Sequence, residues 1–558
     1  MSALNSPEDS GGKVRRKRDR QFWVMLGALS LCACAAILLC VAYAPWTQPS
    51  LGATQVEKPI HQDGSLPIKF VPGDIIVQWK KGLTRSQKEI IRAKYAIAPR
   101  TRYTVSMPSP NDSATADFEV DVLDALQNSE TASKKLEQLQ LRTIEQLSNE
   151  PEVEFAQPNY LYEPATLPAS NETRSIAPND FYYVKGTEWG VSSPPVKQKI
   201  ASGHSNANAG RPRTGTRMRE SSQSSVRSPK IEKPNRSSLN VIKPQSTADK
   251  DPTAKTIRSD YGIRADKAWA NNHFSDPDTF IGIVDTGIQF SHRDLKGNIW
   301  NGIGKDFYSF SPIPITTWDP VDDAHGTHVA GIIAAVGNNG KGIVGVAWRA
   351  KLIIAKFMGP NHWATTEAAV GAIDYLTDLK ENHGFHIVAI NLSWVGAGQD
   401  KALLRAIKHA GRDEILCVVA AGNYHLNNDK DLVYPANFDT SRDNIDNTGR
   451  LAFNSIISVA AIKPDGTLAD FSDYGRSTVH IAAPGMDIVS TWPNDTYRLD
   501  SGTSSSAAFV SGAIALYASS HPGAGARDIR KAILDTATPV AALKGLVATG
   551  GTLNVSTF

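Results

Sequence analysis

Short apolar runs alternate with helical stretches along the C-terminal half of the chain. The runs of strand length cover residues 280–284, 351–357, 387–392 and 417–421. The helical stretches cover residues 328–336, 365–380, 401–410 and 505–517. Strand and helix in alternation are typical of a mostly parallel sheet that is covered by helices on both faces. We therefore expect an α/β fold over residues 260–558.

A smaller patterned region precedes this half of the chain. Its expected strands are residues 70–79 and 153–160, and its expected helices are residues 83–95 and 132–147. Residues 70–79 alternate along a β-branched run, and Thr84 and Ser86 are N-cap candidates for the first helix. Two strands and two helices predict a small α+β domain over residues 66–165.

The N-terminus carries a basic segment followed by a long apolar run. Lys and Arg cluster between residues 13 and 20, and residues 22–44 contain no charged side chain. As a helix these 23 residues would be about 34 Å long at ~1.5 Å per residue, enough to span a bilayer. Positive charge ahead of such a run keeps the N-terminus cytoplasmic. We expect a cytoplasmic tail at residues 1–21, membrane contact at 22–44, a spacer at 45–65 and export of the rest.

The form of this export signal remains open. The length of the apolar run favours an uncleaved, single-pass signal anchor. The small residues Ala42 and Ala44 instead favour a signal peptide that is cleaved, so that the protein is secreted. Lipid attachment at Cys34 is a third form.

Residues 192–259 differ in composition from both patterned regions. They are rich in Ser, Asn and Pro, and hold 14 Lys or Arg against 4 Asp or Glu. Such a segment buries too little apolar surface to offset the entropy of ordering, so we expect a disordered basic insertion. A solvated linker is the simpler interpretation, and salt-sensitive binding to a polyanion is the alternative.

Charge and cysteine content narrow the function classes. The formal net charge of +3 over 558 residues is near balance, so no specific nucleic-acid partner is expected. Three of the four cysteines lie in the N-terminal apolar run, which leaves Cys417 alone in the body of the chain. One cysteine forms no internal disulfide and offers no zinc spacing, so Cys417 is expected to be a buried thiol.

Three short segments together supply an acid, a base and a nucleophile. They are Val284–Gly287, His325–Gly331 and Ser501–Ser504. Asp285 follows an apolar strand, His325 opens a helix of small residues, and Ser504 begins another such helix, where free amides and the helix dipole support it. A serine is a weak nucleophile that needs a histidine as its base. The segments predict attack by Ser504, with His325 as general base and Asp285 orienting the imidazole.

Asn423 is the candidate for stabilising a negatively charged oxygen in the transition state. It follows an apolar strand and Gly422, so its side-chain amide lies at a strand end. Together with the backbone N–H of Ser504, this amide would form an oxyanion hole.

The chain order Asp, His, Ser is that of the subtilisin-like serine proteases, and residues 260–558 resemble that family along their length. Further matching stretches are residues 288–295, 342–347, 390–393, 434–436, 481–485 and 551–555. Residues 70–164 resemble the inhibitory propeptide of the family. Residues 178–190 resemble the usual start of the mature enzyme, which we place within residues 166–191.

The resemblance implies where a peptide substrate binds. The strand that pairs with an extended peptide consists of Ser393, Trp394, Val395 and Gly396. The primary pocket is walled by Ala420, Ala421 and Gly422, with Val433 as its floor. Trp394 is expected to line an outer apolar pocket. Since no carboxylate lies in the primary pocket, an apolar or small residue is expected before the scissile bond.

The resemblance also implies a structural calcium ion, with no cofactor for catalysis. Asp294 and Asn339 occupy positions where family members often bind calcium. Carboxylate and amide oxygens are suitable ligands for this ion.

Two functions remain open. The first is an exported serine endopeptidase, acting on protein or peptide substrates and made as a self-processing zymogen whose propeptide is its own inhibitor. The alternative is a catalytically impaired protease fold that serves as a binding or scaffold protein. Its support comes from the residues after Ser504, where the family usually has Met-Ala and then Pro and His, and this chain has Ser505, Ser506, Ala508 and Phe509.

Overall fold

The computed structural model describes the two patterned regions of the chain. The described residues are 69–80, 82–105, 116–123, 130–165, 259–271, 273–300, 304–309, 311–314, 324–359, 362–441 and 453–558. They belong to one compact unit, residues 60–558. The expected cytoplasmic tail, membrane run, spacer, start of the mature region and basic insertion to residue 258 lie outside the described residues. Within the described ranges, no helix has the length and apolar character needed to cross a bilayer.

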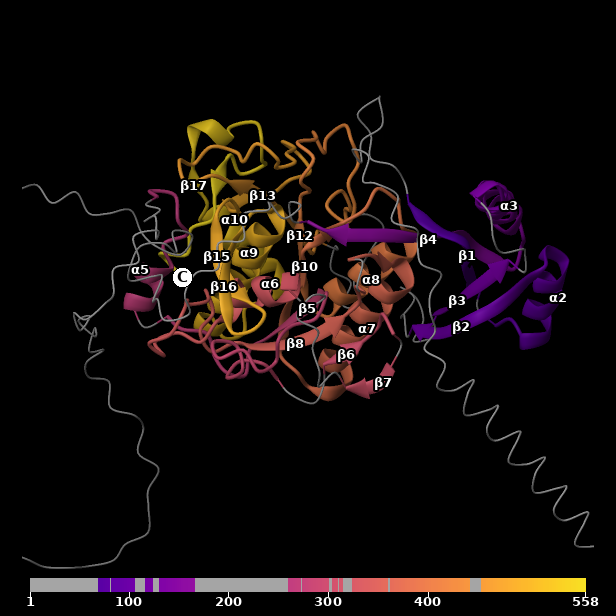
Figure 1. Ribbon diagram of the computed structural model, residues 1–558, viewed down its shortest axis with the longest axis horizontal. Helices are drawn as coiled ribbons and strands as arrows, with labels where there is room; N and C mark the ends of the chain where they lie inside the picture. The colour runs from indigo at the N-terminus through magenta and orange to yellow at the C-terminus, as the bar shows by residue number, and fades with distance from the viewer. Residues whose placement is uncertain are drawn as a thin grey trace, which may run out of the picture. The chain divides into compact units, whose positions relative to one another are not determined.

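A ten-stranded sheet forms the centre of the C-terminal region (Figure 1). Its strands, in spatial order, are β17 (Thr538–Pro539), β18 (Gly551–Thr552), β14 (Ile481–Pro484), β13 (Ile456–Ile462), β12 (Leu416–Ala420), β10 (Ile387–Leu392), β5 (Phe280–Asp285), β8 (Lys351–Lys356), β6 (Lys305–Asp306) and β7 (Ser311–Pro314). Neighbouring strands from β18 to β6 run parallel, and the outermost pairs are antiparallel. The expected mostly parallel sheet is confirmed.

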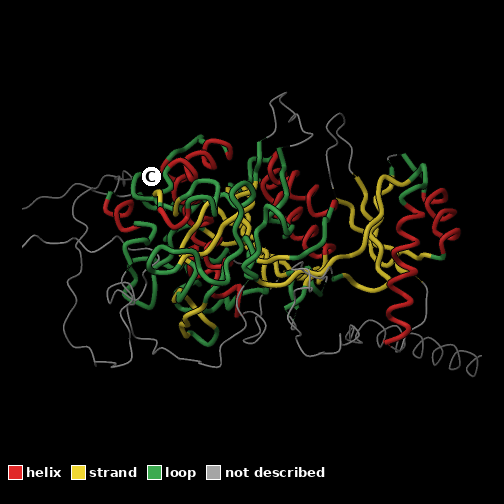
Figure 2. The backbone as a smooth tube through the Cα atoms, turned by 90° about the horizontal axis from the view of Figure 1, so that it is seen from above, coloured by secondary structure: helices red, strands yellow, loops and turns green. Residues whose placement is uncertain are grey.

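Helices cover both faces of this sheet, as the red segments beside the yellow strands in Figure 2 show. One face carries α6 (Ala324–Ala334) and α9 (Thr503–Ser520), with α10 (Ala526–Asp535) packed on α9, and the other carries α7 (Thr366–His383) and α8 (Lys401–Arg412). Successive strand residues point to opposite faces, so Ile281 packs with α9 whereas Phe280 packs with α7. Burial on both faces explains why these strands are continuous apolar runs in the sequence.

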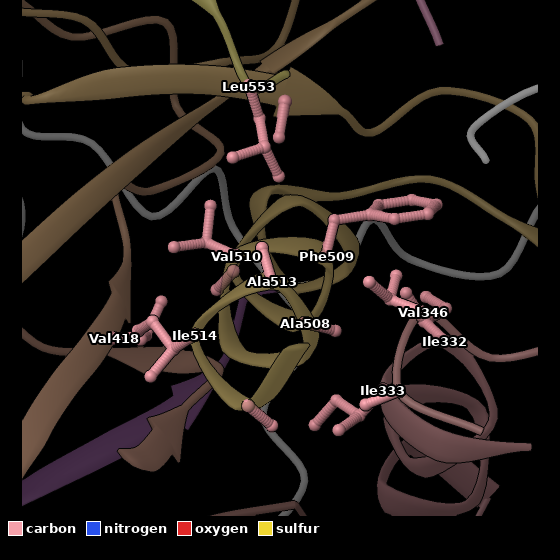
Figure 3. Close-up of a cluster of buried hydrophobic side chains, with 14 of the residues drawn as sticks. Ile332, Ile333, Val346, Val418, Ala508, Phe509, Val510, Ala513, Ile514 and Leu553 are labelled. Carbon is pink, nitrogen blue, oxygen red and sulfur yellow. The ribbon is translucent and has the colours of Figure 1, made fainter. Parts of the chain in front are cut away.

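Helix α9 is apolar around its circumference and almost fully buried. Figure 3 shows its side chains pointing outward in several directions, with Ile514 toward Val418 of β12 and Phe509 toward Val346. A helix that is apolar on every side is stable only inside a core. This packing fixes the position of the first turn of α9, which contains Ser504.

The N-terminal region is a small α+β domain. Its strands are β1 (Phe70–Trp79), β2 (Ile97–Val105), β3 (Ala116–Leu123) and β4 (Val153–Pro164), and its helices are α2 (Arg85–Tyr95) and α3 (Glu130–Leu147). Both helices lie on one side of the strands in Figure 2, where they pack on the face that carries Ile75 and Val77 of β1. Ile76 and Phe155 on the other face join the core cluster that contains α7 and α8.

The sequence interpretation of this small domain was wrong in one respect, because it predicted two strands and the structure has four. Charged residues interrupt strands β2 and β3, and one proline lies in β2, so their sequences lack the continuous apolar run of a buried strand. Of the two N-cap candidates for α2, Thr84 is confirmed and Ser86 is not, and the helix begins at residue 85 rather than 83. Thr84 Oγ1 accepts a hydrogen bond from Gln87 N at 3.3 Å, while the Gln87 side chain accepts one from Thr84 N at 2.8 Å.

The remaining elements are short. They are α5 (Ala265–Ala270), β9 (Ala364–Thr365), β11 (Trp394–Val395), the hairpin of β15 (Ile488–Trp492) and β16 (Thr496–Asp500), and the 3-10 helix η1 (Ala541–Leu543). Helices α6 and α9 both begin earlier than predicted, so that His325 and Ser504 each lie in the first helical turn.

Candidate active site

Asp285 ends strand β5 directly beside the first turn of α6. Its Oδ1 lies 2.7 Å from His325 Nδ1 and also accepts a hydrogen bond of 2.7 Å from Thr286 N. Both side chains are buried. With Nδ1 donating to Asp285, the Nε2 of a neutral His325 carries a lone pair, and it has no hydrogen-bond partner among the described residues. The arrangement leaves Nε2 ready to accept a proton.

The close approach of α6 to the end of β5 depends on Gly326. A Cβ atom at this position would lie 2.1 Å from the carbonyl oxygen of Gly287, which no structure tolerates without a backbone shift. Gly326 N donates a hydrogen bond of 3.0 Å to Thr286 Oγ1. A larger residue after His325 would therefore move the imidazole away from Asp285.

Burial and charge act on His325 in opposite directions. Burial lowers the pKa of His325, while the charge of Asp285, its hydrogen bond to the ring and the charge of Asp500 raise it, and the pKa ends above its ordinary value. Asp285 thus stabilises the imidazolium that forms when His325 takes a proton. Burial lowers the pKa of the neighbouring His328, whose Nε2 lies 3.0 Å from the carbonyl oxygen of Ile488, so His328 has a structural place.

Hydrogen bonds connect Ser504 to Ser393, which follows strand β10, and through Ser393 to Asn391 within that strand. Ser393 Oγ donates to the carbonyl oxygen of Ser504 at 3.0 Å, and Asn391 Nδ2 donates to Ser393 Oγ at 2.8 Å. Ser511, two turns along α9, donates to Asn391 Oδ1 at 2.9 Å. Ser393 thereby connects Ser504, the predicted nucleophile, to the strand that was expected to bind substrate.

The unusual residues after Ser504 are accommodated inside the fold. Ser506 Oγ lies 3.1 Å from the carbonyl oxygens of both Ala483 and Pro484 on β14, so its hydroxyl is satisfied there. Ala508 and Phe509 belong to the buried core around α9. These side chains fill structural positions in the core, which weakens the main support for an impaired site.

Thr503 orients the amide of Asn423, and the sequence interpretation missed it. Asn423 Oδ1 accepts hydrogen bonds from both the backbone N and the Oγ1 of Thr503, each at 2.9 Å. Its Nδ2 is buried and has no partner among the described residues. Because the amide oxygen is held, the free N–H groups are available to a third atom near Ser504. The signal in the sequence was the threonine directly before the nucleophile.

The end of strand β4 occupies the position expected of a substrate. The carbonyl oxygen of Ala165 accepts a hydrogen bond of 3.0 Å from Ser504 N, and Ala165 N donates one of 2.9 Å to the carbonyl oxygen of Ser393. Pro164 pairs with Trp394 in antiparallel register, and on its other edge β4 pairs with β9. The strand from the small domain is thus the middle one of three.

Ala165 packs where a residue before a scissile bond is expected. Its side chain is buried in a small apolar cluster with Val395, Ala420 and Val433. Ala421 is not in this cluster, because neighbouring residues of an extended strand point in opposite directions, and it joins the core around α9 instead. Gly422 adopts a φ of 121°, and a Cβ there would lie 1.9 Å from Asp473 Oδ2. Of the expected pocket residues, Ala420 and Val433 contact the same apolar cluster as Ala165.

Trp394 lies under the strand and is fully buried. Its indole Nε1 donates a hydrogen bond of 3.0 Å to the carbonyl oxygen of Val284, next to Asp285. Its rings pack against Phe357 and, edge to face at 4.9 Å, against Tyr162 of β4. The residue expected to line an outer apolar pocket therefore forms its base, and Tyr162 covers it.

Asp294 and Asn339, the expected calcium ligands, contact each other. Asn339 Nδ2 donates to Asp294 Oδ1 at 2.8 Å, while Asp294 Oδ2 accepts from Ile343 N at 3.0 Å and from the Tyr497 hydroxyl at 2.9 Å. As oriented, the pair presents an amide nitrogen rather than an oxygen to the carboxylate. Calcium ligation would require the Asn339 amide to turn, so calcium stays a prediction.

One other group of side chains, among the residues that the structure describes, brings potential metal ligands together. Buried His409 lies 3.4 Å from Asp413 and 3.6 Å from Glu381 through Nε2, and 3.3 Å from Asp374 through Nδ1. Burial lowers the pKa of His409, but the hydrogen bond and charge of Asp374 raise it to a net increase. The contacts of His409 with these three acids describe this cluster.

The chain is similar in sequence to known proteases. Residues 276–552 match the Subtilase family. Subtilisin DY of Bacillus licheniformis is 33% identical over 279 residues, which cover 50% of this chain and 89% of the relative. Thermitase of Thermoactinomyces vulgaris is 33% identical over 268 residues, covering 47% and 81%. Extracellular basic protease of Dichelobacter nodosus is 32% identical over 297 residues, covering 46% and 45%.

Proposed function

We propose that this chain, which belongs to the subtilase family and is a serine endopeptidase of protein or peptide substrates, is made as a zymogen. The bond that it would cut in its own chain is Ala165–Thr166. The observation that supports this bond is the contact between the carbonyl oxygen of Ala165 and Ser504 N. The residues 66–165 act as an inhibitory propeptide whose last strand lies in the place of substrate.

The proposed reaction assigns one task to each side chain. Ser504 Oγ attacks the carbonyl carbon, and His325 Nε2 takes the proton and returns it to the leaving amine. Asp285 holds the imidazole in the required tautomer and stabilises its cation, as its 2.7 Å contact with Nδ1 supports. The acyl-enzyme on Ser504 is then hydrolysed by water, which His325 activates in turn.

The negative oxygen of the tetrahedral intermediate is proposed to bind between two donors. Ser504 N contacts the carbonyl oxygen of Ala165. Asn423, whose Oδ1 is held by Thr503, has a buried Nδ2 with no partner among the described residues. Donors that strengthen their contact as charge develops stabilise the transition state more than the substrate. No step requires a metal ion.

Export is supported by one relative whose name places it outside the cell, the extracellular basic protease of Dichelobacter nodosus. Another relative, of Bacillus subtilis, is named the major intracellular serine protease, so the N-terminal sequence of this chain carries most of the argument. We propose that residues 22–44 direct this export, either as a single-pass anchor or as a cleaved signal peptide. The catalytic region then lies outside the cytoplasm in both forms.

An active-site probe tests the function against the scaffold alternative. A fluorophosphonate reacts with a serine only where a neighbouring base activates it, so processed wild-type protein is expected to be labelled. Ser504→Ala should abolish labelling, whereas Ser505→Ala, which removes the adjacent buried serine, should retain it. Processed wild-type protein that stays unlabelled would favour the scaffold alternative.

A further inference from the structure

Tyr162 is enclosed completely, although it belongs to the strand that the proposed reaction would release. It is the fourth residue before the proposed scissile bond, counting Ala165 as the first, and its side chain is fully buried. The ring lies edge to face on Trp394 at a centroid distance of 4.9 Å. A Cβ on Gly396 would lie 2.7 Å from Tyr162 Cδ1, so the backbone of the substrate strand borders the ring closely.

The hydroxyl of Tyr162 ends on a buried carboxylate. Tyr162 Oη donates a hydrogen bond of 2.7 Å to Asp400 Oδ2, and Asp400 is fully buried. Thr366 Oγ1 donates to the same oxygen. Burial raises the pKa of Asp400, while the hydrogen bonds from Thr366 and Tyr162 act in the opposite direction by stabilising the charged form.

Asp400 has a structural task that needs only one of its two oxygens. Its Oδ1 caps helix α8 by accepting a hydrogen bond of 2.8 Å from Leu403 N. Gln157 Nε2 of β4 also donates to Oδ1 at 2.8 Å. Serine, threonine or asparagine would cap α8 equally well, so capping alone does not account for the second oxygen, which faces Tyr162.

This juxtaposition has a consequence for any peptide that later replaces β4. A phenylalanine in the place of Tyr162 would fill the apolar part of the site against Trp394 but would leave Asp400 Oδ2 without its tyrosyl donor in a dry environment. Asp400 Oδ2 would then keep Thr366 Oγ1 as its donor but lose the tyrosyl one. Sites built to hydrogen-bond a hydroxyl discriminate against analogues that lack it, because a buried polar group loses a partner that water does not replace.

We propose that Asp400 is a specificity-determining residue that selects tyrosine as the fourth residue before the scissile bond of substrates. Trp394 supplies the apolar surface for the ring, and Asp400 distinguishes a phenol from a phenyl group. The inference rests on the proposed function, since it concerns the substrates of that same active site.

The test uses processed full-chain enzyme and peptide p-nitroanilides. The reference peptide is acetyl-Tyr-Glu-Pro-Ala-p-nitroanilide, which copies residues 162–165. Two analogues replace its tyrosine by phenylalanine or by O-methyltyrosine, which keeps the ring and loses the donor. We expect kcat/KM to fall about tenfold or more for both analogues, in keeping with a hydrogen bond to a charged group.

A variant that keeps the helix cap separates specificity from folding. Asp400→Ser retains an N-cap oxygen but does not reach the phenol, so the ratio of kcat/KM between the tyrosine and phenylalanine peptides is expected to fall to about one. The matched control is Asp528→Ser, an exposed acid in the first turn of α10, where the ratio is expected to stay as in wild type.

The possible failures are distinguishable. Equal cleavage of all three peptides by wild-type enzyme would overturn the role of Asp400 and leave the endopeptidase intact. A tyrosine preference that persists in Asp400→Ser would overturn it as well. Hydrolysis of none of the peptides, together with no fluorophosphonate labelling, would overturn the proposed function itself. The wild-type comparison of the tyrosine and phenylalanine peptides, which removes the hydroxyl without adding volume, decides the matter even where Asp400→Ser does not fold.

Discussion

The backbone nitrogen of Ser504 donates a 3.0 Å hydrogen bond to the carbonyl oxygen of Ala165. One partner begins helix α9 in the C-terminal region, and the other follows strand β4 of the small domain. The contact places a carbonyl group against the residue that the sequence marks as nucleophile. This hydrogen bond places the Ala165 carbonyl group where self-processing by Ser504 would cut the chain.

Asn423→Ala is predicted to lower kcat by ~10²–10³-fold with little change in KM, because it removes one of the two oxyanion donors. Thr503→Val should lower kcat in the same direction by a smaller factor, since Asn423 Oδ1 would lose the hydroxyl that holds it. Steady-state kinetics on one peptide measures both effects. An Asn423→Ala variant with less than a tenfold loss in kcat would remove Asn423 from the oxyanion hole.

The pH dependence of kcat/KM should report the environment of His325. Its pKa is raised by Asp285 against the effect of burial, and a base must be neutral to accept a proton, so activity rises with pH through an apparent pKa above 6.5. Asp285→Asn should cut kcat by ~10⁴ and move the acidic limb of the profile to lower pH. An acidic limb that stays in place in Asp285→Asn would show that another group controls it.

The substrate residue before the scissile bond is predicted to be apolar or small. Ala165 packs with Val395, Ala420 and Val433, and none of these side chains carries a charge. A peptide library sequenced after partial digestion gives this preference directly. A strict requirement for Lys or Arg at this position would contradict the assignment of Ala420 and Val433 to the primary pocket.

The buried carboxyl group of Asp473 is predicted to lower the free energy of unfolding as the pH rises. Burial raises the pKa of Asp473 to about 8, against the lowering effect of hydrogen bonds from Leu426 and Tyr424. The unfolded carboxyl titrates near ~3.9, so its stabilising contribution is complete below that pH and is lost progressively up to about 8.

Denaturant unfolding of Asp473→Asn in the Ser504→Ala background, where self-digestion is absent, tests this assignment. Relative to the parent, the variant should gain up to about 1.4 kcal/mol of stability per pH unit between pH ~4 and the folded-state pKa. A difference between the two proteins that does not vary with pH would contradict it. The same residue borders Gly422, so Asp473 also helps to place Asn423.

Asp294→Asn is predicted to lower the free energy of unfolding by ~1–3 kcal/mol without any added metal. Asp294 accepts hydrogen bonds from the buried Ile343 N and the Tyr497 hydroxyl, and the amide group of asparagine would put an N–H donor in place of one of the accepting oxygens. Thermal melting in the Ser504→Ala background measures this, with exposed Asp278→Asn as the control. An unchanged melting temperature would contradict the role of Asp294. A calcium-dependent rise that Asp294→Asn abolishes would establish calcium at this site.

The local sequence was sufficient to predict a site residue where one short segment contains both the strand or helix and the reactive side chain. Asp285 ends a buried strand, and His325 begins a helix of small residues, so their placement at neighbouring ends of a sheet and a helix could be predicted. The parallel order of strands followed from the continuous apolar runs and the helices between them. Strands β2 and β3 could not be found in this way, since their polar residues belong to the sheet of a small domain with little core.

Contacts between distant segments were not predictable from the sequence. Tyr162 and Asp400 meet only because β4 lies between β9 and β11, and nothing near either residue indicates the other. The side chain of Ala421 joins the core around α9 while that of Ala420 packs with Ala165, because a one-residue step along a strand reverses the side-chain direction. Thr503 precedes the nucleophile in sequence, yet its role depends on Asn423 from another strand end.

Intact-mass spectrometry of newly made protein, paired with N-terminal sequencing of the first cleaved product, tests the central claim most directly. Wild-type protein is predicted to release a fragment that ends at Ala165 and a partner that begins at Thr166. Ser504→Ala is predicted to remain uncut at this bond, while Ser505→Ala is cut as in wild type. A first cut at another bond, or cutting at Ala165–Thr166 in Ser504→Ala expressed and purified alone, would contradict self-processing by Ser504.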